Sequence, residues 1–264
     1  MSDTAWIAPE RPDLVWFTGS DSLRFLNDII SQELGDMERG DTRRSFLLEP
    51  QGKLRFLLWV VRDDDRIGLV TDGGRGAELA EALRRYRIRV DVEIEEEPDE
   101  VWIVVGEWEG YDLSWPDVER RLVIGERPAL EIGDQTEYEA LRIAAGEPRW
   151  GVDVDESTIP HESGLVPASV DFDKGCFLGQ ELVARIDSRG GNTPRNLRLL
   201  ETDGEVVAGD PVRLDGAEVG NVTSATSGAA LAMLKRTVSI GDTVEAGGSP
   251  AVVKPLPPKP LPRS

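Results

Sequence analysis

The sequence predicts an α+β fold that ends in a small antiparallel β-barrel. In the first half, runs with β-strand patterning alternate with two helical patterns. From about Arg195 the chain changes to short alternating strands separated by Gly and Asp turns, which is typical of a barrel. A length of 264 residues is sufficient for two or three compact units, each with its own core.

The elements of the first half follow from periodicity and turn residues. A strand that ends at a glycine turn is followed by a segment with apolar residues at helical spacing; a hairpin, a second helix and another strand come next. The expected elements are a strand at 13–19, a helix at 20–34, a hairpin with a third strand at 45–72, a helix at 74–88 and a strand at 90–97. This order of strands and helices suggests a ferredoxin-like layer.

Composition restricts the possible partners and compartments. The chain has 50 acidic and 30 basic residues and a net charge of −20, whereas nucleic-acid binding normally requires a basic surface. The N-terminus lacks the features of a signal peptide, and no apolar run is long enough to span a membrane. A single cysteine cannot form an intramolecular disulfide. We therefore expect a soluble cytoplasmic protein with no direct nucleic-acid or membrane partner.

The metal-ligand inventory is equally restrictive. His161 is the only histidine and Cys176 the only cysteine. A zinc ion or iron–sulfur cluster held by one chain needs about four nitrogen or sulfur ligands. We therefore expect no resident metal site.

The stretch KGCFLGQE surrounds the only thiol, so any thiol chemistry depends on Cys176. Lys174 lies two residues earlier, and in an extended segment its ammonium would share a face with the thiol and favour the thiolate. Gly175 and Gly179 permit turns around the cysteine, and Glu181 lies in the first turn of an expected helix. The alternative is that Cys176 is a small buried apolar residue.

A second candidate lies on the helix expected before a Gly- and Pro-rich passage that ends near Val166. Tyr138 and Arg142 are four residues apart and share one helix face. An aromatic ring for stacking and a guanidinium for a carboxylate would suit a flat, anionic ligand. The sequence alone favours the alternative, an ordinary amphipathic helix with an exposed arginine.

These motifs carry a family resemblance. The chain resembles the YgfZ-type folate-binding proteins, relatives of the aminomethyltransferase (T-protein) of the glycine cleavage system. The strongest match is KGCFLGQELVAR, Lys174–Arg185. Weaker matches occur in the expected order, and together they extend from about residue 13 to 253: TGSDSLRFLND, LEPQGKLRF, LRIAAGEPRWGVD with PHESGL, and EVGNVTSAT.

The resemblance implies a three-module cloverleaf around a central hole that binds tetrahydrofolate. Residues 1–193 would form a folate-binding region, split by a ferredoxin-like layer inserted at about 45–125. Residues 194–253 would form the antiparallel β-barrel, and residues 254–264 a proline-rich tail that is extended or mobile.

The resemblance also implies a function. Members of the family are folate-dependent factors in the assembly or repair of iron–sulfur proteins, and they affect enzymes such as those of tRNA thiolation. For this chain it implies tetrahydrofolate as cofactor, iron–sulfur assembly or client proteins as partners, and an indirect effect on tRNA modification. A chain with one thiol cannot hold a cluster alone, but it could present a single ligand or nucleophile to the cluster of a partner. The oligomeric state stays open.

On this interpretation the site residues have the following roles. Cys176 is the functional thiol and Lys174 stabilises its thiolate. Gly175 and Gly179 shape the loop, and Gln180 and Glu181 hold the loop and the following helix through backbone hydrogen bonds. Arg142 matches an arginine of the T-protein segment LR-x-x-AG and contacts folate together with Tyr138, whereas Glu162 either contacts the ligand or stabilises a turn.

One departure from the T-proteins separates the functional classes. T-proteins carry an acidic pair in the hairpin at the positions of Arg55 and Phe56, and neither residue can accept a proton as a general base. We therefore expect an accessory protein rather than a classical enzyme. Two alternatives stay open: an aminomethyltransferase-like one-carbon transferase that uses folate, and a scaffold of the same fold that docks proteins without a ligand.

Overall fold

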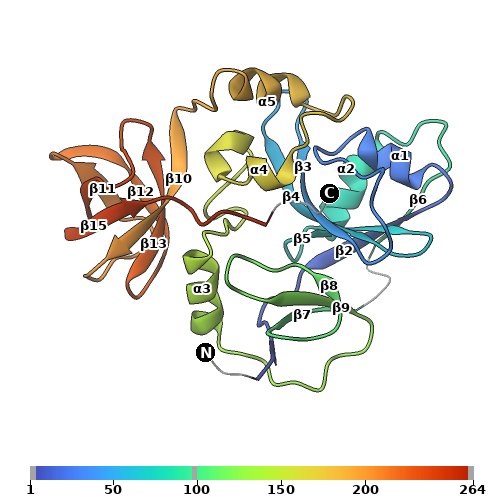
Figure 1. Cartoon of the computed structure of the whole chain (residues 1–264), viewed down its shortest axis with the longest axis horizontal. Coiled ribbons are helices and arrows are strands. Elements are labelled where there is room, and N and C mark those ends of the chain that lie inside the picture. Colours follow the sequence, from blue (N-terminus) through green and yellow to red (C-terminus); the bar gives the residue numbers. More distant parts are fainter. Residues whose placement is uncertain (1–3, 97–99, 261–264) are drawn as a thin grey trace.

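The computed structural model describes residues 4–96 and 100–260. Two β-sheets and a closed β-barrel make up its architecture, with short helices on and between them (Figure 1). The α+β fold with a C-terminal antiparallel barrel is therefore confirmed.

The first sheet has five antiparallel strands in the order β3-β4-β5-β2-β6. Its strands are β2 Asp13–Thr18, β3 Thr42–Leu48, β4 Leu54–Arg62, β5 Ile67–Thr71 and β6 Glu93–Glu96. Helices α1 Ser22–Asn27 and α2 Gly76–Arg84 cover one face, where Val15 and Phe17 of β2 lie in their core. The alternate residues Leu14 and Trp16 belong to the core on the opposite face, as the period-2 pattern of a strand requires.

Helix α1 is shorter than the helix expected at 20–34. It ends at Asn27, and the residues up to Leu34 form turns although Ile30 and Leu34 are buried. The side chain of Asn27 accepts a hydrogen bond from the backbone of Leu34 at 2.8 Å. Ser31 pairs by its backbone N–H with the carbonyl of Phe46 on β3. These non-local bonds replace the helical ones that local periodicity predicted.

The second sheet has four strands in the order β1-β7-β9-β8 and packs against the open face of the first. Its strands are β1 Trp6–Ile7, β7 Val101–Val105, β8 Tyr111–Asp112 and β9 Arg120–Ile124. The interval 45–125 thus contributes strands to both sheets, and a ferredoxin-like layer inserted at these bounds stays a prediction. Strand β2, which begins at Asp13, lies between β5 and β6 in the first sheet, and β7 of the second sheet pairs with β1.

Helix α3, Gln135–Ala144, connects the second sheet to an irregular passage with three short helices. These are η1 Pro160–Ser163, α4 Val166–Ser169 and α5 Gln180–Asp187. The side chain of Asp134 caps α3 by accepting bonds from the backbone of Thr136 and Glu137. The helix predicted after Gly179 is present as α5.

The barrel closes in the strand order β10-β13-β12-β11-β14-β15. Its strands are β10 Arg195–Thr202, β11 Pro211–Leu214, β12 Ala217–Thr226, β13 Ala229–Lys235, β14 Thr243–Ala246 and β15 Ser249–Lys254. Inward residues such as Leu200, Val222 and Val253 form its own core. Closure leaves no free sheet edge, which would otherwise be open to pairing with other chains.

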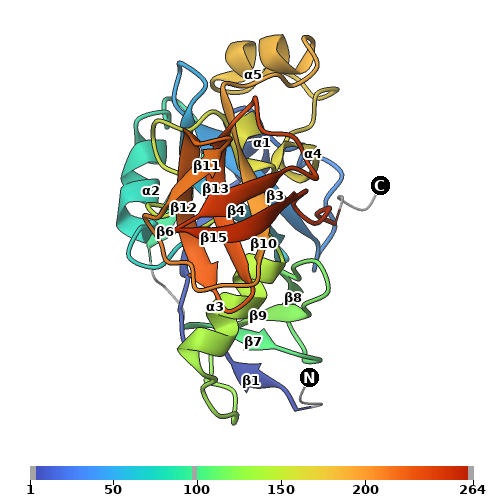
Figure 2. The same ribbon diagram turned by 90° about the vertical axis from the view of Figure 1, so that its left-hand side faces the viewer.

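The proline-rich tail packs on the rest of the molecule as far as residue 260. After β15 the chain leaves the barrel and crosses to the centre of the molecule (Figures 1 and 2). Lys259 is buried there, and its ammonium donates to the carbonyls of Ala145 and Gly146. Residues 261–264 lie outside the described part of the chain.

No helix in the described ranges combines the length and apolar character needed to cross a membrane.

Candidate functional site

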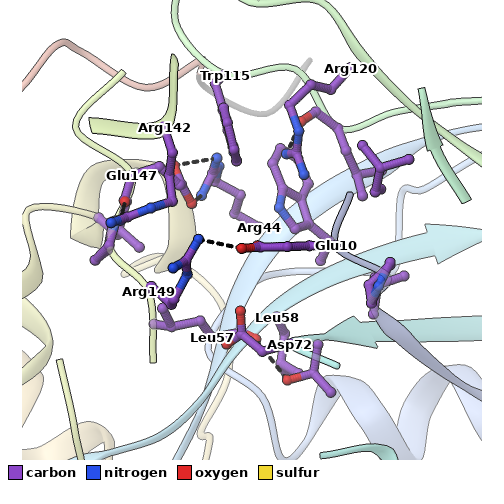
Figure 3. A pocket seen from close by; sticks show the side chains of 18 of the residues that line it. Glu10, Arg44, Leu57, Leu58, Asp72, Trp115, Arg120, Arg142, Glu147 and Arg149 are labelled. Atoms are coloured by element: carbon purple, nitrogen blue, oxygen red, sulfur yellow. Dashed lines mark hydrogen bonds and ion pairs between the residues drawn. The ribbon is translucent and has the colours of Figure 1, made fainter. Parts of the chain in front are cut away.

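A cavity of about 120 Å³ lies where the two sheets, α3 and the segment 147–149 meet (Figure 3). Strands β3 and β4 contribute Arg44, Phe46 and Trp59, and the second sheet contributes Arg120. Residues that are far apart in sequence therefore line a single space, and Arg44, Arg120 and Glu147 are among those labelled in Figure 3.

Two further hollows share walls with this cavity. One, of about 210 Å³, shares Arg44 and Trp59 with it and is also lined by Pro260 of the C-terminal segment. The other, of about 510 Å³, shares Glu10, Arg11, Asp72, Gly73 and Arg149 with it. The cavity alone is smaller than the ~300–1,000 Å³ typical of small-molecule sites, so a larger ligand would also use a neighbouring hollow.

Arginine–aromatic pairs form much of the cavity wall. The guanidinium of Arg44 lies 4.1 Å from the ring centre of Trp59, and that of Arg120 lies 3.7 Å from the ring centre of Trp115. Tyr138 packs against Trp115 at 5.3 Å between ring centres and accepts a hydrogen bond from Arg120 at 3.0 Å. Stacking orients these cations and keeps their planes fixed.

Arg44 and Arg120 each keep a buried donor without an acceptor. Arg44 uses both terminal nitrogens on Glu147, at 2.6 and 2.8 Å, and Arg120 donates to Leu113 and Tyr138. Within the described residues, the Nε atoms of Arg44 and Arg120 are buried and have no hydrogen-bond partner. An unpaired buried donor is costly, and most buried polar groups in proteins have a partner.

Glu147 is the buried counter-ion of the cavity. Burial opposes its charge, but the Arg44 guanidinium and the Lys259 ammonium hold the pKa of Glu147 below its ordinary value. Its carboxylate is therefore committed to structure and is not a proton acceptor at neutral pH.

Asp72 is a functional candidate that sequence reasoning missed. It follows β5 at the turn TDGG and lines both the cavity and the larger hollow. Burial raises the pKa of Asp72 to about 6, although the charge of Arg75 acts in the opposite direction. Only its place after a buried strand could have drawn attention to it, and the same position is usual for a simple turn residue.

Arg142 lies in the cavity wall, but all its donors are used. Its five N–H groups donate to Glu139 twice, to Asp153, to the carbonyl of Glu147 and to Ser224 of the barrel. It is 3% exposed, not the surface arginine of an amphipathic helix. A direct folate contact by Arg142 would need one of these bonds to be exchanged and stays a prediction.

The two other predicted folate contacts differ in position. Tyr138 is buried and lines the cavity beside Arg142 on α3. Glu162 is outside the residues that line the three hollows. Its carboxylate accepts bonds from the backbone of Ile159 and from Arg195 of β10, at 3.0 and 3.3 Å. Glu162 thus stabilises a turn and joins η1 to the barrel.

Cys176 is exposed, on a loop that is anchored on both sides. The ammonium of Lys174 donates to the carbonyls of Asn27, Ile30 and Gln32 at 2.7–2.9 Å, and the backbone of Leu178 donates to Ile29. Burial lowers the pKa of Lys174 to about 8. The ammonium therefore holds the loop to the turns after α1, and stabilisation of the thiolate stays a prediction.

Gly179 and Gln180 of the motif lie against neighbouring backbone, whereas Gly175 and Glu181 are exposed. Gly179 has φ +76°, and a Cβ there would lie 2.5 Å from the carbonyl oxygen of Glu49 in the β3–β4 turn. Gln180 accepts a bond from the backbone of Phe177 at 3.2 Å. Gly175 has open space around it, and Glu181 lies exposed in the first turn of α5. Gly179 and Gln180 thus shape the end of the loop.

The hairpin offers no carboxylate to the cavity. Phe56 is buried with the guanidinium of Arg75 over its ring at 4.0 Å, and Arg55 pairs with Glu49 at 3.3 Å. The β4 residues that line the cavity are Leu57, Leu58 and Trp59. In residues 4–96 and 100–260, no group of three or more His, Cys, Asp or Glu could hold a metal ion.

The chain has the fold of an aminomethyltransferase. It superposes with a TM-score of 0.82 on the crystal structure of the glycine cleavage system aminomethyltransferase T from Bartonella henselae, covering 95% of this chain and 85% of that one. The two sequences are 16% identical, so this likeness concerns the fold.

No family model matches the chain, but sequence comparison finds several relatives. An uncharacterized protein of Haemophilus influenzae is 24% identical over 237 residues, which are 84% of each chain. The mitochondrial iron–sulfur cluster assembly factor IBA57 homolog of Cryptococcus neoformans is 37% identical over 109 residues. That match covers 38% of this chain and 29% of the fungal protein.

Proposed function

We propose that this chain is a YgfZ-type, tetrahydrofolate-binding accessory protein for the assembly or repair of iron–sulfur proteins. It would act in the cytoplasm with Cys176 as its functional thiol, and tRNA modification would respond indirectly through client enzymes. The shared fold of aminomethyltransferase T supports folate binding, and the match to an iron–sulfur assembly factor supports the context.

One observation carries the ligand half of the proposal: the unpaired Nε donors of Arg44 and Arg120 in a wall of stacked aromatic rings. A pterin ring is flat and presents carbonyl and ring-nitrogen acceptors to such donors. Its amine and ring N–H groups need an acceptor, and the carboxyl of Asp72 is available in the same cavity. The neighbouring hollows would hold the remainder of the molecule.

The thiol half rests on exposure and anchoring. Cys176 is accessible to another protein, while Lys174 and Leu178 fix the loop on either side of it. A fixed thiol reaches a partner with little loss of conformational freedom on binding. The thiolate would serve as one ligand or nucleophile toward a cluster that the partner holds.

Calorimetric titration with tetrahydrofolate under anaerobic, reducing conditions tests the ligand half. We expect saturable binding near one site per chain. Arg120→Lys keeps the charge but removes the Nε donor, and loss of one such bond should weaken binding about tenfold. Arg127→Lys is the matched control, because Arg127 is exposed and lies over Trp102 outside the cavity. Absence of saturable binding to the native chain contradicts the proposal.

Complementation tests the thiol half. In cells that lack the native copy, Cys176→Ala should fail to restore the activity of iron–sulfur enzymes, whereas its affinity for tetrahydrofolate should equal that of the native chain. Full restoration by Cys176→Ala would show that the thiol has no role.

A one-carbon transferase is a second candidate, and Asp72 is the observation that favours it. A carboxyl whose pKa is raised to about 6 inside a ligand cavity is suited to proton transfer near neutral pH. Turnover of tetrahydrofolate with an aminomethyl or N-methyl donor, abolished by Asp72→Asn, would select this function. Binding without turnover leaves the accessory role.

A further inference from the structure

The C-terminal segment 255–260 ends beside the cavity. It leaves β15 at Lys254 and crosses from the barrel to the centre of the molecule (Figures 1 and 2). Pro260, at its far end, lines the hollow that shares Arg44 and Trp59 with the cavity.

Close packing holds the first part of this segment. Leu256 packs with Ile143 of α3 and with residues of β10 and β13. A Cβ at Gly146 would lie 2.9 Å from Pro257, and a Cβ at Gly164 would lie 2.5 Å from Leu256. These distances leave no space for a side chain at either glycine. Both glycines also have positive φ, which other residues rarely adopt.

Lys259 holds the second part through its charge. Its side chain is 3% exposed, and its ammonium donates to the carbonyls of Ala145 and Gly146, which end α3. A cation at this position satisfies carbonyls that have no helical partner and complements the helix dipole. The same nitrogen lies 3.5 Å from the carboxylate of Glu147.

Glu147 connects Lys259 to the cavity. One carboxylate is shared between the guanidinium of Arg44 and the ammonium of Lys259, so this buried group carries one net positive charge. Arg44 is held by Glu147 through both terminal nitrogens, which leaves its Nε for another acceptor. The net charge of the group formed by Arg44, Glu147 and Lys259, and the position of Glu147 within it, therefore depend on Lys259 of the C-terminal segment.

We propose that residues 255–260 are a strap that closes one side of the ligand site, and that Lys259 is a positioning residue acting on Arg44 through Glu147. This inference rests on the proposed function for the identity of the ligand, an anion with acceptor atoms. Ligand affinity and docking of the strap are coupled: each stabilises the other.

The docking of the strap can be tested without any ligand. The chain has five lysines, and brief acetylation of the native protein, read by mass spectrometry, reports how accessible each amine is. Lys259 should react far more slowly than Lys254, whose side chain is 43% exposed and pairs with Glu201 on the barrel surface. If Lys259 reacts as fast as Lys254, the strap is not docked and the proposal fails.

The coupling is tested by a matched pair of variants. Lys259→Met should weaken tetrahydrofolate binding about tenfold, since it removes a buried charge-assisted contact. Lys254→Met removes the same charge five residues earlier and should leave affinity unchanged. Tetrahydrofolate should also slow the acetylation of Lys259 further in the native chain.

The outcomes separate the two proposals. A protected Lys259 together with native affinity in Lys259→Met overturns the positioning role. Failure of the native chain to bind tetrahydrofolate overturns the proposed function, and acetylation of Lys259 then still decides whether the strap is docked. If Lys259→Met does not fold, Lys259→Gln, which keeps a hydrogen-bond donor, replaces it in the same titration.

Discussion

Three buried arginines around one cavity differ in how many of their donors are used. Every N–H of Arg142 has an acceptor, and these bonds join α3, the segment 147–153 and the barrel. Arg44 and Arg120 each retain an unpaired Nε. The side-chain type is the same in all three, so the number of acceptors within reach decides whether an arginine has all its donors paired or keeps one unpaired.

Asp72 allows a prediction at the same scale. Its pKa is about 6 in the folded chain against an ordinary 3.8, so between these values the folded chain binds more protons than the unfolded chain. The cost of its charge is absent below about pH 4 and is complete above about pH 6. Asp72→Asn should therefore raise the free energy of unfolding above pH 6, on the order of 1 kcal/mol given partial exposure to water, and have little effect near pH 4.

Urea unfolding at several pH values measures this difference. Asp91→Asn is a control of opposite sign, because hydrogen bonds from Ser20 lower the pKa of Asp91. Asp91 therefore contributes stability at neutral pH that is lost on acidification. A constant effect of Asp72→Asn across the pH range would show that the Asp72 carboxyl is not perturbed.

Two elements meet where the cysteine loop ends and α5 begins. Gly52 in the β3–β4 turn and Gly179 before α5 both have positive φ, and a Cβ at either would lie within 2.6 Å of atoms of the other element. The hairpin and the cysteine loop therefore approach backbone to backbone, which only glycine permits.

Gly179→Ala should lower the free energy of unfolding by about 2 kcal/mol or more, because it adds left-handed strain to a steric clash. Gly175→Ala is the matched control, because Gly175 does not have a positive φ and a Cβ added there would meet no other atom within 4 Å. This substitution should change the free energy of unfolding by no more than about 0.5 kcal/mol. Urea unfolding measures both. Equal effects would mean that the loop is not held against the hairpin.

At the scale of the whole molecule, the site exists because three parts meet. The two sheets supply Arg44 and Arg120, α3 supplies Tyr138, and the barrel reaches the site through Ser224 and the strap. Ser224 of the barrel and Lys259 of the segment that follows it therefore both contact residues of the cavity wall.

The sequence by itself determined the strands of the first sheet, the hairpin turns, α5 and the barrel, because periodicity and turn residues act over a few neighbouring positions. It also identified the segment around Cys176. Only the tertiary structure decided that Arg142 has no free donor, that Asp72 lies in a cavity and that Lys259 is buried. These properties depend on acceptors and burial supplied by residues far away in the chain, and local patterns carry no information about them.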